Sequence, residues 1–156
     1  KRQANGILFI TINQPGSNNN RDSKIPGALE EYAIRNQANM AWLKDSFRTG
    51  ENSEAIVVAM QSDTNVVTDE EFGFGDFLNT IAVLANEYKK PILIIQGDTH
   101  EYVVDQSIHD EKDHPIQNVL RLVVPGAKKV QAIEVTVKPQ ETNILKVFTF
   151  SPISLH

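Results

Sequence analysis

Cysteine is absent from this chain of 156 residues, which excludes disulfide bonds, thiolate metal sites and cysteine nucleophiles. Basic residues are outnumbered, with 15 Lys and Arg against 20 Asp and Glu, and no Lys/Arg block occurs that could neutralise a row of phosphates. The apolar runs, such as ILII at residues 92–95, are far shorter than the about 20 residues that cross a bilayer. The sequence therefore predicts neither a nucleic-acid partner nor a membrane span.

What the chain does contain is typical of a folded globular protein: 40% of its residues are hydrophobic and 22% are charged. A chain of this length can enclose one core, and no linker or internal repeat divides it. We therefore predict a single domain over residues 1–156. Because the chain starts without methionine and enters a strand-like run almost at once, we expect it to be part of a larger domain.

Strands and helices alternate over the first two thirds of the chain. Apolar, largely β-branched runs at residues 7–12, 55–60 and 91–95 predict strands that are buried on both faces. Apolar positions at helical spacing predict helices over residues 29–47 and 74–88. This order predicts an α/β fold in which the polar exits of the strands meet at one edge of a sheet, where ligands usually bind.

After residue 100 the sequence no longer alternates between strands and helices, and one long loop precedes the first helix. Residues 119–124, 130–137 and 145–150 predict short strands, so we expect a mixed sheet with an antiparallel C-terminal part. Trp42 is expected to extend the buried face of the first helix. Between the first strand and that helix, residues 13–27 are rich in Pro, Gly, Ser and Asn and predict a long loop, a candidate wall of a binding site.

The segment IIQGDTHEY at residues 94–102 is the strongest candidate for chemistry. Gly97 allows a sharp turn after the strand, so Asp98 and His100 could point into one pocket as oxygen and nitrogen ligands of a metal. In the alternative interpretation, Asp98 caps its own backbone and His100 is a hydrogen-bonded surface group. Spacing alone favours this second interpretation.

These residues resemble the last signature of the calcineurin-like metallophosphoesterases, Gly-His-x-His at the end of a strand. Gly97 and His100 match it, and Asp98 stands where the first histidine usually is. Gln61, after the strand at 55–60, falls where that family commonly has another metal-binding histidine. Two further features resemble a divergent bacterial branch of the family. They are the PGSNNN loop before a long helix that carries Arg35, Asn39, Trp42 and Leu43, and the later Pro125-Gly126.

The resemblance implies a β-sandwich flanked by helices and a hydrolase of small phosphorylated substrates that uses divalent Mn, Fe, Zn or Mg. It implies two sets of site residues: metal ligands His100, Asp98 and Gln61, and substrate contacts Asn18, Asn19 and Asp63.

The earlier signatures of that family, Asp-x-His, Gly-Asp and Gly-Asn-His-Asp/Glu, are expected to precede Lys1. Gly-Asn-His does not occur in this sequence, and the Gly-Asp and Asp-x-His letters at residues 75–76 and 97–100 lie too late in the chain to be those signatures. The resemblance therefore implies the C-terminal half of a catalytic domain, inactive in isolation and able to self-associate through an exposed sheet edge. A non-catalytic member that serves binding or scaffolding is the alternative, because Gln61 and Asp98 replace histidines.

Two further histidines, His109 and His114, lie in the polar run at residues 105–114. Asp110, Glu111 and Asp113 could join them in an adventitious metal site, but a solvated loop is favoured because no regular element fixes their spacing.

Overall fold

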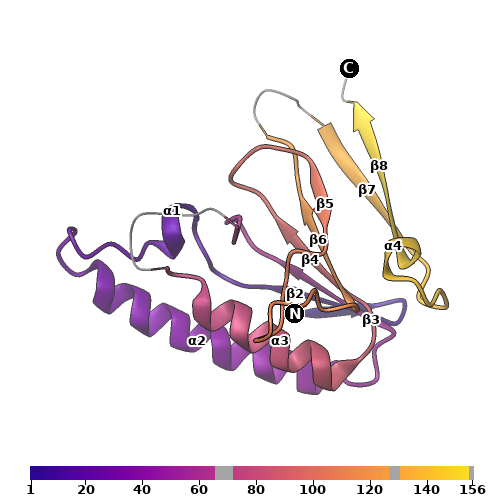
Figure 1. The fold of residues 1–156 in the computed structure, drawn as a ribbon, viewed down its shortest axis with the longest axis horizontal. Helices are drawn as coiled ribbons and strands as arrows, with labels where there is room; N and C mark the ends of the chain where they lie inside the picture. Colours follow the sequence, from indigo (N-terminus) through magenta and orange to yellow (C-terminus); the bar gives the residue numbers. More distant parts are fainter. Residues whose placement is uncertain (66–71, 127–130, 155–156) are drawn as a thin grey trace.

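A mixed sheet of six strands, in the order β1-β2-β3-β4-β6-β5, forms the centre of the computed structural model, which describes residues 1–65, 72–126 and 131–154 (Figure 1). Its strands are β1 (Arg2–Ala4), β2 (Ile7–Thr11), β3 (Ala55–Ala59), β4 (Ile92–Gln96), β5 (Val103–Asp105) and β6 (Val119–Val123). The four middle strands are parallel to one another, and the short edge strands β1 and β5 pair antiparallel with β2 and β6. The predicted α/β class and mixed sheet are confirmed.

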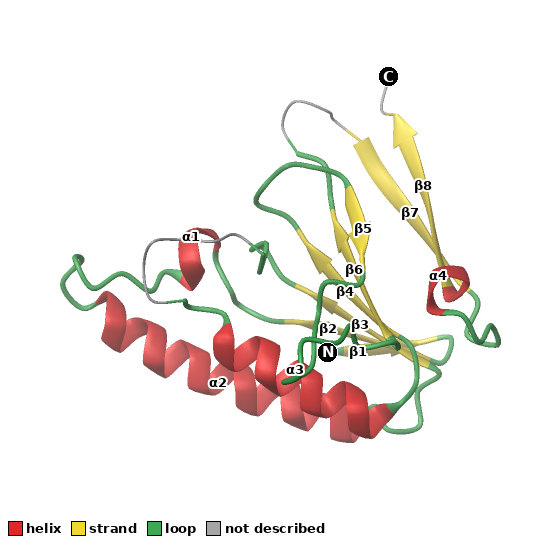
Figure 2. Cartoon of the chain, viewed as in Figure 1, coloured by secondary structure: helices red, strands yellow, loops and turns green. Residues whose placement is uncertain are grey.

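Helices α2 (Ala28–Thr49) and α3 (Gly75–Tyr88) lie side by side across one face of the sheet (Figure 2). Their buried side chains, among them Leu43, Phe77 and Ile81, join those of β2, β3 and β4 in one hydrophobic cluster. Trp42 was expected in this core, but 38% of it is exposed. Its indole Nε1–H donates to the carbonyl of Thr11 at 3.0 Å, which satisfies the polar atom at the helix margin.

A hairpin of β7 (Gln131–Val137) and β8 (Phe148–Ser154) forms a second, antiparallel sheet on the opposite face, with the short helix α4 (Ile144–Val147) beside it. A second hydrophobic cluster joins Val147 and Phe148 to Leu93, Leu120 and other residues of the main sheet. The antiparallel C-terminal part is therefore confirmed for β7 and β8. It holds in part for β6, which pairs antiparallel with β5 and in parallel with β4. The parallel pairing agrees with its apolar sequence, which suits a position covered on both faces.

The first hairpin was missed by the sequence analysis. Asn5 and Gly6 both have positive φ angles, 48° and 76°, and join β1 to β2. Asn-Gly is the preferred pair for a two-residue hairpin turn, because both positions of that turn need positive φ. The pair was a usable signal, and it shows that the first predicted strand has an antiparallel neighbour.

None of the helices in the described ranges has the length and apolar character that crossing a membrane requires.

Candidate functional site

The loops that follow β2, β3 and β4 meet at the carboxyl edge of the parallel strands. The backbone N–H of Ser62, after β3, donates to the carbonyl of Gln14, after β2, at 3.2 Å. The N–H of Gly97, after β4, donates to the carbonyl of Gln61 at 3.0 Å. This is the edge at which an open α/β sheet usually binds its ligand.

Unusual backbone conformations gather at this edge. Ser17 to Asn20, in and after the short turn α1 (Gly16–Asn19), are four consecutive residues with φ between 53° and 59°. Asp98 and His100 also have positive φ, 73° and 62°. Such conformations cost about 1–3 kcal/mol each for residues other than glycine and persist where surrounding contacts hold them, often at ligand sites.

Asp98 and Gln61, two of the ligands that the resemblance implies, lie together. Gln61 Nε2 donates to Asp98 Oδ1 at 3.5 Å, and the Gly16 N–H donates to Gln61 Oε1. A Cβ atom on Gly16 would lie 2.6 Å and 2.8 Å from the two carboxylate oxygens of Asp98, so only glycine allows this approach. In the described residues, Asp98 forms no ion pair with Lys or Arg.

His100 does not join this group. Its ring is exposed and lies against Gly126, where an added Cβ would come within 2.2 Å of the ring carbons Cγ and Cδ2. Across the part of the chain that the structure describes, no hydrogen bond links the His100 ring to Asp98 or Gln61. Both residues have positive φ, and the described contacts place the His100 ring beside Gly126. That Asp98 and His100 point into one pocket therefore stays a prediction.

Asn18 and Asn19, expected to contact substrate, are buried and serve the fold. The amide of Asn19 donates to the carbonyl of Gly73 at 2.9 Å, and Asn18 Oδ1 accepts from the N–H of Gly73 at 2.7 Å. Arg35 donates to Asn19 Oδ1 at 2.5 Å. The two asparagines therefore fasten the loop after β2 to the entry of α3, which gives their side chains a structural role.

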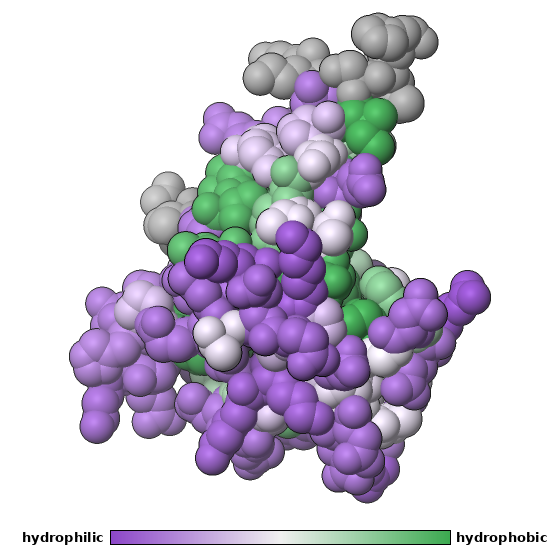
Figure 3. Space-filling view, turned by 90° about the vertical axis from the view of Figure 1, so that its right-hand side faces the viewer, coloured by the Kyte–Doolittle hydropathy of each residue, from purple (hydrophilic) through white to green (hydrophobic). Residues whose placement is uncertain are grey.

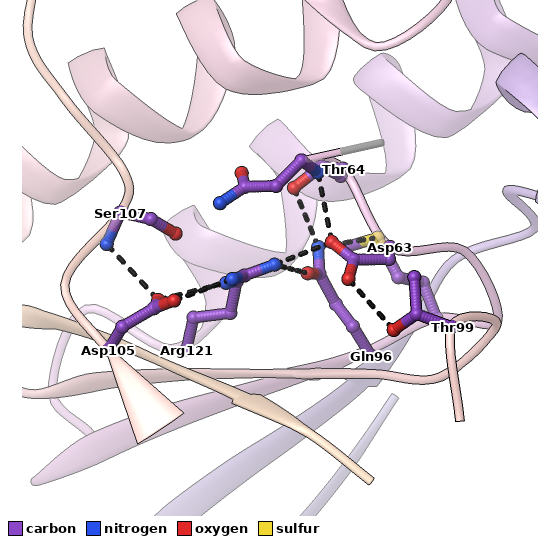
Figure 4. Close-up of polar contacts among 9 residues, drawn as sticks. Asp63, Thr64, Gln96, Thr99, Asp105, Ser107 and Arg121 are labelled. Carbon is purple, nitrogen blue, oxygen red and sulfur yellow. Dashed lines mark hydrogen bonds and ion pairs between the residues drawn. The ribbon is translucent and has the colours of Figure 1, made fainter. Parts of the chain in front are cut away.

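Asp63, the third expected substrate contact, is 6% exposed and is bound within a buried polar network (Figure 4). Its Oδ1 accepts from Arg121 Nη1 at 2.5 Å and its Oδ2 accepts from the hydroxyl of Thr99 at 3.1 Å. Arg121, 4% exposed, also donates to both carboxylate oxygens of Asp105, at 2.9 Å and 2.6 Å. Gln96 joins the network by accepting from Arg121 at 3.3 Å and donating to Thr64 at 2.9 Å.

The network shifts the pKa values of Asp105 and Arg121. Burial alone would raise the pKa of Asp105, but the hydrogen bonds from Arg121 and Ser107 outweigh burial and hold that pKa below its usual range. Burial would conversely lower the pKa of Arg121, and the hydrogen bond and charge of Asp105, with the charge of Asp63, raise it instead. Arg121 therefore stays charged, with a carboxylate on each side.

Sequence reasoning missed Arg121, Gln96 and Asp105. A signal existed for the first of them, because a lone arginine within the apolar run VLRLV of β6 needs carboxylate partners if the strand is buried. Which carboxylates these are depends on the pairing of β6 with β4 and β5, and the sequence analysis had assigned neither pairing.

The residues at the edge fit part of a metal site. Asp98 offers a carboxylate and Gln61 an amide oxygen, ligand types suited to hard divalent cations, and His100 stands two positions along the same turn. Within residues 1–65, 72–126 and 131–154, no three His, Asp or Glu side chains are grouped closely enough to hold a metal ion. The edge therefore supplies a few ligands and not a complete coordination sphere.

The loop containing His109 and His114 is held by its own hydrogen bonds. His109 Nδ1 lies 2.7 Å from Asp113 Oδ1, and Asp110 accepts the backbone N–H groups of Lys112 and His114. The bond from the His114 backbone is the main cause that lowers the pKa of Asp110. These contacts agree with the favoured interpretation of a solvated, self-capped loop.

Comparison with known proteins adds no relative to this picture: no family model, no curated protein and no solved structure matches the chain.

Proposed function

We propose that this chain forms one wall of the active site of a metal-dependent phosphoester hydrolase of the calcineurin-like type. In this proposal the two sheets belong to the β-sandwich of that family, and small phosphorylated compounds are the substrates. Asp98, His100 and Gln61 would be its ligands for a divalent cation such as Mn, Fe, Zn or Mg. Bound cations of this kind polarise the phosphoryl group and make hydroxide available from water near neutral pH. Polypeptide beyond these residues would supply the remaining ligands.

The observation that carries this proposal is the state of Asp98. Its carboxylate lies at the carboxyl edge of three adjacent parallel strands, on a left-handed backbone, and receives only a long hydrogen bond from Gln61 within the described residues. The other carboxylates near the edge, Asp63 and Asp105, each form an ion pair with Arg121. A carboxylate that has no Lys or Arg partner and lies beside other oxygen donors suits a divalent cation, which binds to such oxygen atoms.

A direct test uses the protein that contains this chain, purified and assayed for bound metal and for hydrolysis of an aryl phosphate with added Mn²⁺. The proposal expects metal-stimulated turnover that falls strongly in Asp98→Ala. Protein that holds no metal and turns over no phosphate ester would contradict it. The isolated chain is expected to show no appreciable turnover, because its ligands are too few. Metal-stimulated hydrolysis by the isolated chain that disappeared in His100→Ala would overturn that expectation.

A non-catalytic member of the same fold is the second candidate, and one contact favours it. Gln61 Oε1 accepts from the Gly16 N–H while its Nε2 faces Asp98, so the amide oxygen must turn away from Gly16 before it can reach a cation. Gln61→His discriminates between the candidates. If the proposed hydrolase uses this position for metal, the substitution strengthens Mn²⁺ binding, whereas a pocket that only binds or scaffolds gains nothing.

We also propose that the isolated chain self-associates through the face of the β7–β8 hairpin. Figure 3 shows hydrophobic side chains gathered over the upper part of the molecule, while the lower part is mostly hydrophilic. Leu145 beside the hairpin and Ile153 on β8 are exposed. Among the described residues β7 pairs only with β8, which leaves one of its edges open. Light scattering should detect dimers or larger species that Ile153→Lys reduces to monomer. A wild-type chain that is monomeric at every concentration would contradict this proposal.

A further inference from the structure

We infer that Asp63 and Arg121 are positioning residues for the turn that carries Asp98 and His100. They act through Thr99, which stands between those two residues in the sequence and whose hydroxyl donates to Asp63. This inference rests on the proposed function of that turn as a metal-binding segment. It assigns Asp63 a different role from substrate contact, because its carboxylate is buried and bound on both oxygens.

The turn needs holding because its backbone is strained. Asp98 and His100 both have positive φ, and together these conformations cost about 2–6 kcal/mol, by the usual figure of about 1–3 kcal/mol for each such residue. The ends of the turn are fixed by the Gly97 N–H, which donates to the Gln61 carbonyl, and by the Gly126 N–H, which donates to the carbonyl of His100 at 3.4 Å. Thr99 stands between these two anchors, and its side chain gives the third.

The third anchor, the bond from Thr99 to Asp63, is rigid because Asp63 is itself held by other residues. Asp63 Oδ2 accepts from Thr99 Oγ1, while Asp63 Oδ1 is held by Arg121 and by the N–H of Asn65 at 2.9 Å. Arg121 is in turn fixed by β6 on its backbone and by Asp105 on its far side. Figure 4 shows this path running from Asp105 through Arg121 to Asp63 and Thr99.

Neutralising Arg121 does not by itself require Asp63. The bidentate bond to Asp105 already pairs the guanidinium with one carboxylate in the strongest geometry available to it. Burying a second carboxylate adds a desolvation cost that its attraction to a paired arginine repays only with further hydrogen bonds. The bonds from Thr99 and Asn65 are those further bonds, and the first of them connects the network to the turn.

The test is a series at Thr99, which is exposed and can be changed without opening the core. Thr99→Val removes the hydroxyl at nearly constant shape, and Thr99→Ser retains it. Asp105→Asn is the matched control, because it weakens the hold on Arg121 from the opposite side and leaves the Asp63–Thr99 bond in place. The readouts are NMR shifts and hydrogen exchange of the amides at residues 97–101, Mn²⁺ affinity, and thermal stability.

We expect Thr99→Val to shift these amides, to speed their exchange and to weaken Mn²⁺ binding about tenfold, the usual effect of losing a group that orients a ligand. Thr99→Ser should keep the wild-type amide shifts, exchange rates and Mn²⁺ affinity. Asp105→Asn should lower thermal stability and disturb the turn amides less than Thr99→Val does. Wild-type amide spectra in Thr99→Val would overturn the inference. If the wild-type chain binds no Mn²⁺, the metal proposal fails, but the amide readouts still decide whether Thr99 holds the turn.

Discussion

Two regions of the same strands are equally buried but are stabilised differently. In the middle of the sheet, Ile94 of β4 is inaccessible to solvent and belongs to one hydrophobic cluster with Phe77 of helix α3, which is equally buried. Two residues further along β4, Gln96 is just as buried but takes part in hydrogen bonds with Arg121 and Thr64. Area removed from water stabilises the first region, and paired charges stabilise the second. The first tolerates changes of shape poorly, and the second tolerates the loss of a partner poorly.

The largest effect is expected in the apolar region. Phe77→Ala should lower the free energy of unfolding by about 3–5 kcal/mol, because it removes a fully buried ring and leaves a cavity. Val83→Ala, on the same helix but 54% exposed, should change it by only about 0.5 kcal/mol. Urea denaturation measures both, and similar losses in the two variants would show that α3 does not pack as described.

The polar region is expected to be nearly as sensitive to one change. Arg121→Met should lower the free energy of unfolding by about 3 kcal/mol, at the low end for breaking a buried ion pair, because Asp105 is partly open to water. Arg48→Met is the control: it removes an exposed ion pair with Asp45 and should cost less than about 1 kcal/mol. Equal stability of the two variants would mean that the network at the sheet edge does not form.

Acid should weaken the polar region first. The folded-state pKa of Asp105 is lowered, so its contribution to stability is fully present above the unfolded value of about 4 and is lost as pH falls through the folded value. Asp105→Asn should therefore flatten the fall in unfolding free energy between about pH 4 and lower pH. Denaturation at a series of pH values measures this, and an unchanged slope would contradict the account.

The smallest effect on stability is expected at Gly16. An alanine there meets the Asp98 carboxylate, which can rotate away, so Gly16→Ala should cost less than about 1 kcal/mol. It should nevertheless separate Asp98 from Gln61 and reduce Mn²⁺ affinity. Gly75→Ala is the matched control, because nothing lies within 4 Å of the added Cβ. Equal Mn²⁺ affinity in the two variants would contradict the assignment of Asp98 as a metal ligand.

The contrast between the regions also explains what could be predicted from sequence. Strands β2, β3 and β4 and helices α2 and α3 were predicted within a few residues, because burial imposes apolar runs and helical periodicity that single segments display. The edge depends on partners far apart in the chain. Asp63 and Arg121 are 58 positions apart, and nothing local to either indicates the pair.

The candidate ligands illustrate the same limit. The family resemblance singled out Gln61 and Asp98, and their meeting agrees with the rule that the carboxyl ends of parallel strands share an edge. The direction of the His100 ring does not follow from that rule, because it depends on the positive φ of His100 and on the close approach of Gly126, from a segment 26 positions later. Asn18 and Asn19 were likewise assigned from a loop whose packing against Gly73 the sequence does not display.

Mn²⁺ titration of the ¹⁵N-labelled chain tests the central claim most directly, since the paramagnetic ion broadens resonances close to its binding site. The account predicts early, selective broadening at Gly16, Gln61, Asp98 and His100, absent in Asp98→Asn. Broadening confined to the acidic loop around Asp110 and Asp113, or spread evenly over the chain, would contradict it.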